Sequence, residues 1–321
     1  MSVKIFQDYQ GASVKIDGQC YLFVEETTEA INADPSEIGG VFDSCLECTL
    51  ESSTSSSSDS SESFNNVSSS SSSSSRGFNP LDVSPVGWWD ATDSDTITDS
   101  GGNVSQWDDK SGNNYDVTQG SGSDQPITGT RNINGLNILD FPQKELSINS
   151  RLGLGANPDV MIAVVIVVDS SVTSDDRWCG FSGNVTNSIK VSVGSDGWAW
   201  RYNNGNDKYT PVTLSTPTIT VMTRPQGGTY GDARCFVNGV EQAESVQTNP
   251  TSIPNDTTQL FEIGDGDVGG GNKRFDGAIG ELIVVEDETL DTRQKLEGYL
   301  AWKWSLEDNL PSDHPYKGAP P

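Results

Sequence analysis

The spacing of apolar and polar residues predicts a β-sandwich over the C-terminal three quarters of the chain. From residue 78 onward, short β-branched and aromatic runs alternate with Gly, Asn, Asp and Pro, a spacing typical of an all-β sandwich or barrel. The runs that we expect to form strands are residues 104–107, 137–141, 159–168, 189–193, 198–202, 218–222, 234–237, 260–263 and 278–285. Every position of Val160–Val168 is apolar, which predicts a strand buried on both faces.

One stretch near the C-terminus predicts a helix. Leu296, Leu300 and Trp304 recur at helical spacing, so the helix has one apolar stripe to lay on the sandwich. Asp291 is the expected N-cap, with Gln294 three residues later as its capping-box partner.

The first 51 residues predict a small β module that docks or anchors the protein. An Asp-Gly turn separates two β-rich runs in residues 14–25, which is a hairpin pattern, and Val41-Phe42 is a third candidate strand. So few apolar side chains usually need a staple, a metal or a partner. Cys20, Cys45 and Cys48 include the C-x-x-C spacing of a zinc site but lack an obvious fourth ligand. A disulfide from Cys20 to Cys45 or Cys48, and simple burial, are the alternatives.

A flexible linker is predicted at residues 52–77. Serine fills 17 of the 24 positions from Ser52 to Ser75, and such a segment buries too little apolar surface to offset its chain entropy. The linker divides the chain into an anchoring module, residues 1–51, and a sandwich domain, residues 78–321.

Charge and hydropathy exclude several classes of partner. The formal net charge of −27 repels DNA and RNA, so no nucleic-acid partner is expected. The longest apolar run has nine residues, whereas a membrane helix needs about 20, so no membrane insertion is expected. The first ten residues lack the apolar run of a secretory signal peptide.

Several motifs in residues 87–316 resemble the concanavalin A-like lectin/laminin-G superfamily, in the form seen in phage and other virion structural proteins. They are, in order, Gly87-Trp88-Trp89-Asp90-Ala91, Trp107-Asp108-Asp109-Lys110-Ser111-Gly112-Asn113, Asn134-Gly135, Leu139-Asp140-Phe141, Phe236-Val237-Asn238-Gly239, Phe275-Asp276-Gly277-Ala278-Ile279-Gly280-Glu281 and the tail from Leu296 to Tyr316. The resemblance implies a concanavalin-like jelly-roll β-sandwich with one C-terminal helix. Trp88, Trp107, Trp302 and Trp304 lie in these motifs, and we expect them in the core or under the helix.

The resemblance also implies a function. Residues 14–21 with Cys45 and Cys48 are similar to short cysteine-containing modules that precede such domains in phage structural proteins. We therefore expect a virion decoration, fibre or tail adhesin: the N-terminal module binds other virion proteins, and the sandwich, displayed in many copies on the virion surface, binds surface glycans. The alternatives are a glycan-binding module of a bacterial surface protein and a polysaccharide hydrolase or lyase of the same fold.

We expect no enzymatic activity. Glycosidases of this superfamily carry their two carboxylates as E-x-D-x-x-E on one strand, and that pattern is absent. With His314 as the single histidine, a Ser-His-Asp triad is not expected either.

Calcium is the candidate cofactor of the sandwich domain. Asp265, Asp267, Asn272 and Asp276 gather oxygen ligands of the kind that calcium prefers. A solvated acidic hairpin is the alternative. Asp90, Asp93 and Asp95 form a second, weaker cluster.

An aromatic strand is the candidate sugar site. Trp198, Trp200 and Tyr202 alternate and so share one face of a strand. Aromatic faces stack on sugar rings, and Asn203, Asn204 and Asp207 in the following turn offer hydrogen bonds. The alternative is that the three rings fill the sandwich core.

Overall fold

The computed structural model describes residues 77–321 except 156–157, 170–175, 183–188, 195–196, 203–204, 211–212, 226–231, 249–259 and 266–273, and, of the first 76 residues, three short strands. The chain divides into two compact units, Met1–Ser72 and Ser73–Pro321. No helix in the described ranges is long and apolar enough to cross a membrane.

The first unit contains a small antiparallel sheet. β1 (Ser13–Ile16) pairs with β2 (Gln19–Leu22), and β2 pairs with β3 (Val41–Phe42). The predicted hairpin and third strand are therefore confirmed. Cys20 lies on β2 opposite Lys15 and Phe42. Cys45 and Cys48 lie outside the described residues, so the disulfide and the zinc site stay predictions.

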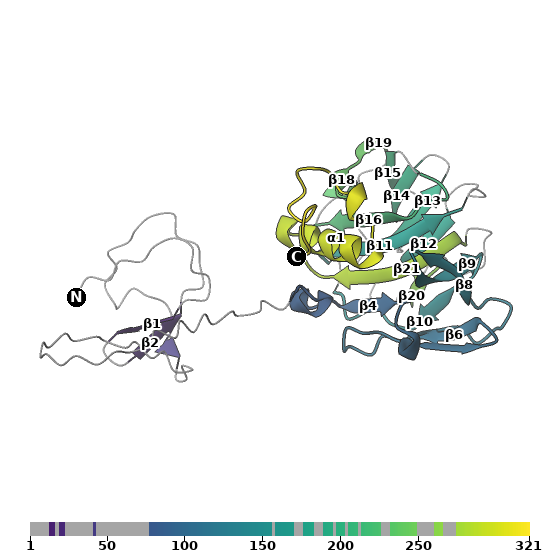
Figure 1. The fold of residues 1–321 in the computed structure, drawn as a ribbon, viewed down its shortest axis with the longest axis horizontal. Helices are drawn as coiled ribbons and strands as arrows, with labels where there is room; N and C mark the ends of the chain where they lie inside the picture. Colours follow the sequence, from purple (N-terminus) through teal and green to yellow (C-terminus); the bar gives the residue numbers. More distant parts are fainter. Residues whose placement is uncertain are drawn as a thin grey trace, which may run out of the picture. The chain divides into compact units, whose positions relative to one another are not determined.

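The second unit is a sandwich of antiparallel strands, with one α-helix among its described residues (Figure 1). Its elements are η2 (Pro80–Val83), β4 (Gly87–Asp90), η3 (Ser94–Thr96), β5 (Ile97–Ser100), β6 (Asn103–Trp107), β7 (Val117–Thr118), β8 (Ile127–Ile133), β9 (Leu136–Pro142), β10 (Leu146–Ile148), β11 (Val160–Val168), β12 (Asp176–Ser182), β13 (Ile189–Gly194), β14 (Gly197–Tyr202), β15 (Gly205–Thr210), β16 (Thr218–Arg224), β17 (Arg234–Val237), β18 (Val240–Glu241), β19 (Ala243–Thr248), β20 (Leu260–Ile263), β21 (Asp276–Val285), α1 (Leu290–Trp304) and η5 (Glu307–Asn309). The predicted jelly-roll-type sandwich with one C-terminal helix is confirmed.

Two layers follow from the strand pairing. In the front layer, β11 pairs with β16 and β21, β16 with β17, and β21 with β4 and β9. In the back layer the order is β6-β7-β10-β20-β12-β13-β14-β15-β19. The face of the back layer turned away from the front layer is called the outer face below.

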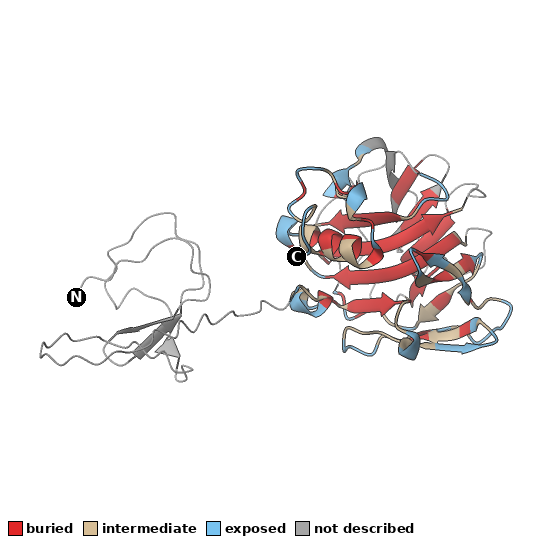
Figure 2. Ribbon diagram, in the orientation of Figure 1, coloured by how far each residue is buried: buried red, intermediate tan, exposed pale blue. Residues whose placement is uncertain are grey.

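Strand β11 is buried on both faces because it belongs to two cores (Figure 2). Val160, Ile162 and Val164 face the core between the layers. Met161 and Ala163, at the alternate positions, face a second core beneath α1. This explains why the run lacks the polar alternation of a surface strand.

Helix α1 begins two residues earlier than the capping-box pattern predicts. Thr289 is the N-cap, and its Oγ1 accepts a hydrogen bond from the backbone N–H of Thr292. Asp291 instead lies in the first turn and pairs with Lys295. The predicted N-cap, Asp291, was wrong. Thr and Asp are both favourable N-cap residues, so the sequence alone does not determine which of Thr289 and Asp291 begins the helix.

The C-terminal tail covers α1. Tyr316 lies so close to the helix that a Cβ atom added to Gly298 would come within 2.6 Å of its Cβ. Trp302 Nε1 donates to the carbonyl of Tyr316, and the backbone N–H of Phe78 donates to the carbonyl of Pro321. Gly298 is therefore present for this close approach, although glycine is a poor helix former.

We expect Gly298→Ala to destabilise the second unit by about 1–2 kcal/mol. In an exposed helix the same change stabilises by about 1 kcal/mol, but here overpacking against Tyr316 outweighs the propensity. Urea unfolding of the full chain, followed by tryptophan fluorescence, measures the sign. The double variant Gly298→Ala, Tyr316→Gly should recover part of the loss, and a stabilised single variant would contradict the packing described.

Candidate functional site

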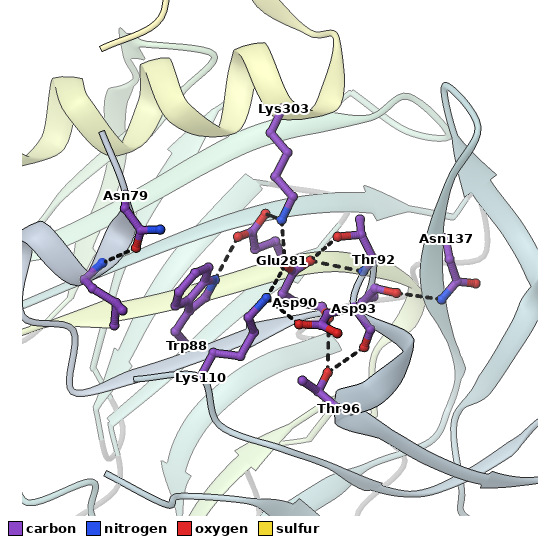
Figure 3. Close-up of polar contacts among 12 residues, drawn as sticks. Asn79, Trp88, Asp90, Thr92, Asp93, Thr96, Lys110, Asn137, Glu281 and Lys303 are labelled. Carbon is purple, nitrogen blue, oxygen red and sulfur yellow. Dashed lines mark hydrogen bonds and ion pairs between the residues drawn. The ribbon is translucent and has the colours of Figure 1, made fainter. Parts of the chain in front are cut away.

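A buried charge network joins α1 to the front layer (Figure 3). Glu281 on β21 has no exposed surface and accepts hydrogen bonds from Trp88 Nε1, Tyr299 Oη and Trp304 Nε1 at 2.8–3.0 Å. Lys303 Nζ lies 2.7 Å from Glu281 and 2.8 Å from Asp90. Burial raises the pKa of Glu281, although Lys303 opposes the effect. These contacts fasten the helix to the sheet.

The same network bears on the second calcium hypothesis, the cluster of Asp90, Asp93 and Asp95. Lys110 Nζ lies 2.9 Å from Asp90 and 2.8 Å from Asp93. Asp90 also pairs with Lys303. Burial tends to raise the pKa of Asp90, but the charge of Lys303 and the bonds from Lys303, Thr92 and Lys110 outweigh it and lower that pKa. Asp95 is exposed. Lysine side chains thus occupy the position that this hypothesis gave to a metal.

The motif around Asp109 is also structural. Its carboxylate accepts hydrogen bonds from the backbone N–H groups of Trp88, Ser111 and Tyr115 at 2.8–3.0 Å. Trp88, Trp107 and Trp304 are at most 5% exposed. Trp302 is half-buried and donates through Nε1 to the carbonyl of Tyr316. The expected positions in the core or at the helix are therefore confirmed.

Arg274 gathers three carboxylates at one end of the back layer. Its guanidinium contacts Asp124 at 2.8 Å, Glu145 at 3.0 Å and Asp265 at 3.3 Å. Burial raises the pKa of Glu145: the charge of Arg274 lowers it, but the neighbouring Asp265 adds to the increase. The Asp265 side chain is only 2% exposed, whereas the other three are 19–34% exposed.

The predicted calcium loop is thus partly occupied by a basic side chain. Asp265 pairs with Arg274. Asp276 is the first residue of β21, and its charge acts on Asp176. Asp267 and Asn272 lie outside the described residues. Among the residues that the structure describes, no group of three or more His, Cys, Asp or Glu side chains is arranged to hold a metal ion. Calcium stays a prediction for the undescribed part of the loop.

Asp176 is the carboxyl group with a strongly altered pKa. It is 5% exposed, and burial followed by the negative charge of Asp276 raises its pKa to about 6. The folded state therefore holds this proton more tightly than the unfolded state, and the resulting stability is lost as the pH rises from about 4 through 6.

We expect Asp176→Asn to stabilise the second unit at pH 7.5 by about 1–2 kcal/mol and to leave it unchanged at pH 4. The amide resembles the protonated acid and carries no charge to bury. Urea midpoints at the two pH values measure the difference. Asp95→Asn, at an exposed position, is the control and should change neither midpoint; equal effects of Asp176→Asn at both pH values would contradict the titration.

The aromatic strand lies in the back layer as β14. Trp198 is fully buried in the core between the layers. A side chain with no exposed surface offers no face to a sugar ring, so the prediction for Trp198 was wrong and the alternative, core packing, holds. Trp200 lies opposite the buried Val191 and opposite Asp207, whereas Asn203 and Asn204 lie outside the described residues.

A row of polar positions crosses the outer face of the back layer. Strand register connects Gln106, Thr118, Ser147, Glu262, Gly180, Lys190, Arg201 and Asn206, each directly opposite the next. The rows on either side contain core residues such as Ile263, Val191 and Phe261. Directly opposite residues share a face, so these positions lie on the face opposite the core. Thr118 is exposed there and Gln106 and Ser147 are half-buried, whereas Glu262 and Gly180 are buried. With strands about 4.8 Å apart, the row extends for about 34 Å.

Sequence analysis missed this row, although a signal was present. On β14, Ala199 follows the core residue Trp198, so the strand that places an aromatic ring in the core places a small residue on the other face. Glu262 alternates in the same way with Phe261 and Ile263. The row becomes visible only when the pairing of distant strands is known.

The second unit is thus a two-layer sandwich of antiparallel strands with a helix near its C-terminus. Residues 141–291 match the Laminin_G_3 family of the concanavalin A-like lectin/glucanases superfamily. This part of the chain is therefore a domain of that superfamily. No curated protein matches the sequence.

Solved structures of several glycosidases are similar to this chain. A Trypanosoma rangeli sialidase in complex with the inhibitor DANA is 14% identical with a TM-score of 0.42, over 63% of this chain and 30% of the sialidase. Domain 4 of AbnA, a GH43 extracellular arabinanase from Geobacillus stearothermophilus, in complex with arabinotriose, is 12% identical with a TM-score of 0.45, over 66% of this chain and 98% of the domain. The chain thus spans about a third of the sialidase's length.

These comparisons correct one prediction. The expectation that the protein is not an enzyme is contradicted, because the similar structures belong to glycoside hydrolases, sialidases and an arabinanase. The missing E-x-D-x-x-E pattern excludes only one placement of the two carboxylates. With identities of 12–14% and TM-scores of 0.42–0.45, no activity is transferred from these enzymes.

Proposed function

We propose that the second unit recognises carbohydrate, by binding or by hydrolysis, and holds the sugar chain along the polar row of its outer face. The observation that carries the proposal is the match of residues 141–291 to a superfamily of lectins and glucanases. The row supports it, because eight strands contribute consecutive polar or glycine positions, and convergent polar groups give a carbohydrate site its orientation.

We further propose that the protein displays this unit on a virion surface. The boundary between the two compact units falls within the serine-rich segment, which suits an anchored module joined to an outward-reaching one. Display in many copies would raise a weak single-site affinity by 10²–10⁴ through avidity. The proposed partners are virion proteins for the first unit and surface glycans for the second.

A glycan array probed with the full chain, with calcium and with a chelator, tests carbohydrate recognition. We expect binding to a defined glycan class, and release of reducing ends from the bound glycan separates hydrolysis from binding alone. Loss of binding in chelator would show that binding requires a divalent cation, as the calcium prediction expects. No binding and no release of reducing ends under any condition would overturn the proposal.

The outer face can be tested by substitution. Ser147→Trp places a large side chain in the middle of the row, and we expect it to weaken glycan binding at least tenfold. Ser121→Trp, at an exposed position outside the row, is the matched control and should bind within twofold of the unchanged protein. Equal binding by the two variants would place the sugar elsewhere.

A further inference from the structure

The turn between β8 and β9 holds the C-terminal end of α1. Asn134 and Gly135 form this turn, with φ values of +50° and +87°. Asn134 Nδ2 donates to the carbonyl of Trp304, the last residue of α1, at 2.8 Å and to the carbonyl of Ser305 at 3.1 Å. The last carbonyls of a helix have no partner within the helix, so this side chain supplies donors that the helix end lacks.

The same two residues form a dipeptide that can lose ammonia. Asparagine is one of the thermally labile residues, and a following glycine leaves its side chain open to attack because glycine has no side chain of its own. The backbone nitrogen of the glycine loses its proton and bonds to Cγ of the asparagine, and the side-chain nitrogen leaves as ammonia. Water then opens the resulting succinimide ring to aspartate or isoaspartate. The reaction therefore needs only water, and no oxidant, reductant or cofactor.

The reacting atoms of this turn are open to water. Asn134 and Gly135 are both exposed, and nothing lies within 4 Å of a Cβ added to Gly135, so the ring has room to form. The backbone N–H of Gly135 donates to Asn132 Oδ1 at 3.3 Å. The attacking nitrogen thus bonds to a side chain of its own hairpin and not to a neighbouring strand.

Deamidation reverses the effect of Asn134 on the helix. A carboxylate oxygen accepts hydrogen bonds and does not donate them, so the bonds to the carbonyls of Trp304 and Ser305 are lost. The new negative charge also lies at the C-terminal end of α1, which carries the negative end of the helix dipole. The product therefore repels the helix end that the amide side chain bound.

A second Asn-Gly pair provides a comparison within the same molecule. Three such pairs occur in the sequence, and the structure describes two of them in full, the pair above and Asn238-Gly239. Asn238 Oδ1 accepts from the backbone N–H of Ile219 at 3.0 Å, a role that an aspartate keeps. Gly239 is half-buried beneath the C-terminal tail, and a Cβ added to it would lie 3.1 Å from His314 Cδ2. This pair is thus more enclosed, and its conversion costs no hydrogen-bond donor.

From these contacts we propose that Asn134 is a site of spontaneous deamidation, and that its conversion loosens the C-terminal end of α1 from the β8–β9 turn. The Asn238-Gly239 pair converts more slowly and disturbs its surroundings less. A converted chain differs from a newly folded one by an added negative charge and a less stable second unit. The proposal does not depend on carbohydrate recognition.

Incubation of the full chain in warm, mildly alkaline buffer tests the site. Peptide mapping by mass spectrometry at successive times quantifies aspartate and isoaspartate at Asn134 and Asn238. We expect Asn134 to convert severalfold faster than Asn238. Asn134→Gln, which keeps an amide but lengthens the side chain, should abolish the early rise in isoaspartate. Conversion of Asn134 at the same rate as Asn238, or more slowly, would overturn the assignment.

The converted chains, separated by anion exchange through their added charge, test the effect on α1. We expect a lower urea midpoint than that of the unconverted chains and faster hydrogen exchange in the last turn of α1. Asn134→Asp should reproduce the lower midpoint, whereas Asn238→Asp, which keeps its acceptor, should change it less. An unchanged midpoint in the converted chains would overturn the loosening, and this outcome can be read whether or not Asn134→Asp folds.

Discussion

Lys303→Met is expected to destabilise the second unit by about 3–5 kcal/mol at pH 7. Lys303 is the cation that Asp90 and Glu281 share, and their side chains are 5% and 0% exposed. Removing one partner of a buried ion pair leaves an uncompensated charge, at a cost of this size. Asp90 keeps Lys110, whereas Glu281 keeps only the neutral donors of Trp88, Tyr299 and Trp304.

The loss should depend on pH. Burial already raises the pKa of Glu281, and Lys303 is the main group that opposes this rise. Without Lys303 the folded state binds the Glu281 proton more tightly, and the stability gained from that proton is present at low pH and lost as the pH rises. The deficit of Lys303→Met relative to the unchanged protein should therefore shrink between pH 7 and pH 5.

Urea unfolding followed by tryptophan fluorescence measures this effect in the full chain. All eight tryptophans lie between Trp88 and Trp304, so the signal reports the second unit. Lys295→Met is the matched control on the same helix. Its partner Asp291 is 71% exposed, and exposed pairs contribute at most about 1 kcal/mol. A deficit below 1 kcal/mol for Lys303→Met, or one independent of pH, would show that the network does not fasten α1.

Gly264→Ala should cost about 3 kcal/mol and disturb the carboxylates around Arg274. Gly264 has φ +87°, and a Cβ there would lie 2.3 Å from the carbonyl oxygen of Lys144 and 2.6 Å from Phe141 Cδ1. The left-handed backbone costs an alanine about 1–2 kcal/mol, and overpacking against a backbone oxygen adds about 1–3 kcal/mol. Asp265 and Glu145 adjoin the two contacting segments, so both carboxylates should move.

Gly135→Ala isolates the close approach. Gly135 has the same φ of +87°, but nothing lies within 4 Å of an added Cβ. It should lose only the backbone contribution of about 1–2 kcal/mol. The difference between the two urea midpoints measures the contact with Lys144 and Phe141, and equal losses would contradict it.

The fold could be predicted from local patterns because each strand carries its own evidence. The apolar run at Val160–Val168 predicted a doubly buried strand. The Asn134-Gly135 and Asn238-Gly239 pairs, quoted above as motifs of the resemblance, all have positive φ, as tight turns require. Helix α1 was predicted from its apolar stripe. Its first residue was not, because a cap depends on which of two suitable side chains the surrounding structure favours.

The candidate site could not be predicted, because it depends on pairing between distant segments. Nothing local places Arg274 among Asp124 and Glu145, residues more than a hundred positions away. The calcium hypothesis was based on the number of oxygen ligands in the loop and did not consider Arg274, which pairs with Asp265. The aromatic hypothesis assigned Trp198 to a sugar-binding face of β14. Trp198 is fully buried, so that face belongs to the core.

Glycan binding by the full chain tests most directly whether the second unit recognises carbohydrate at its outer face. The unchanged protein, Ser147→Trp and Ser121→Trp are compared at equal concentration on one glycan array. We expect the unchanged protein and Ser121→Trp, substituted at an exposed position, to bind the same glycan class, and Ser147→Trp to bind it at least tenfold more weakly. No binding and no release of reducing ends by the unchanged protein would contradict the account.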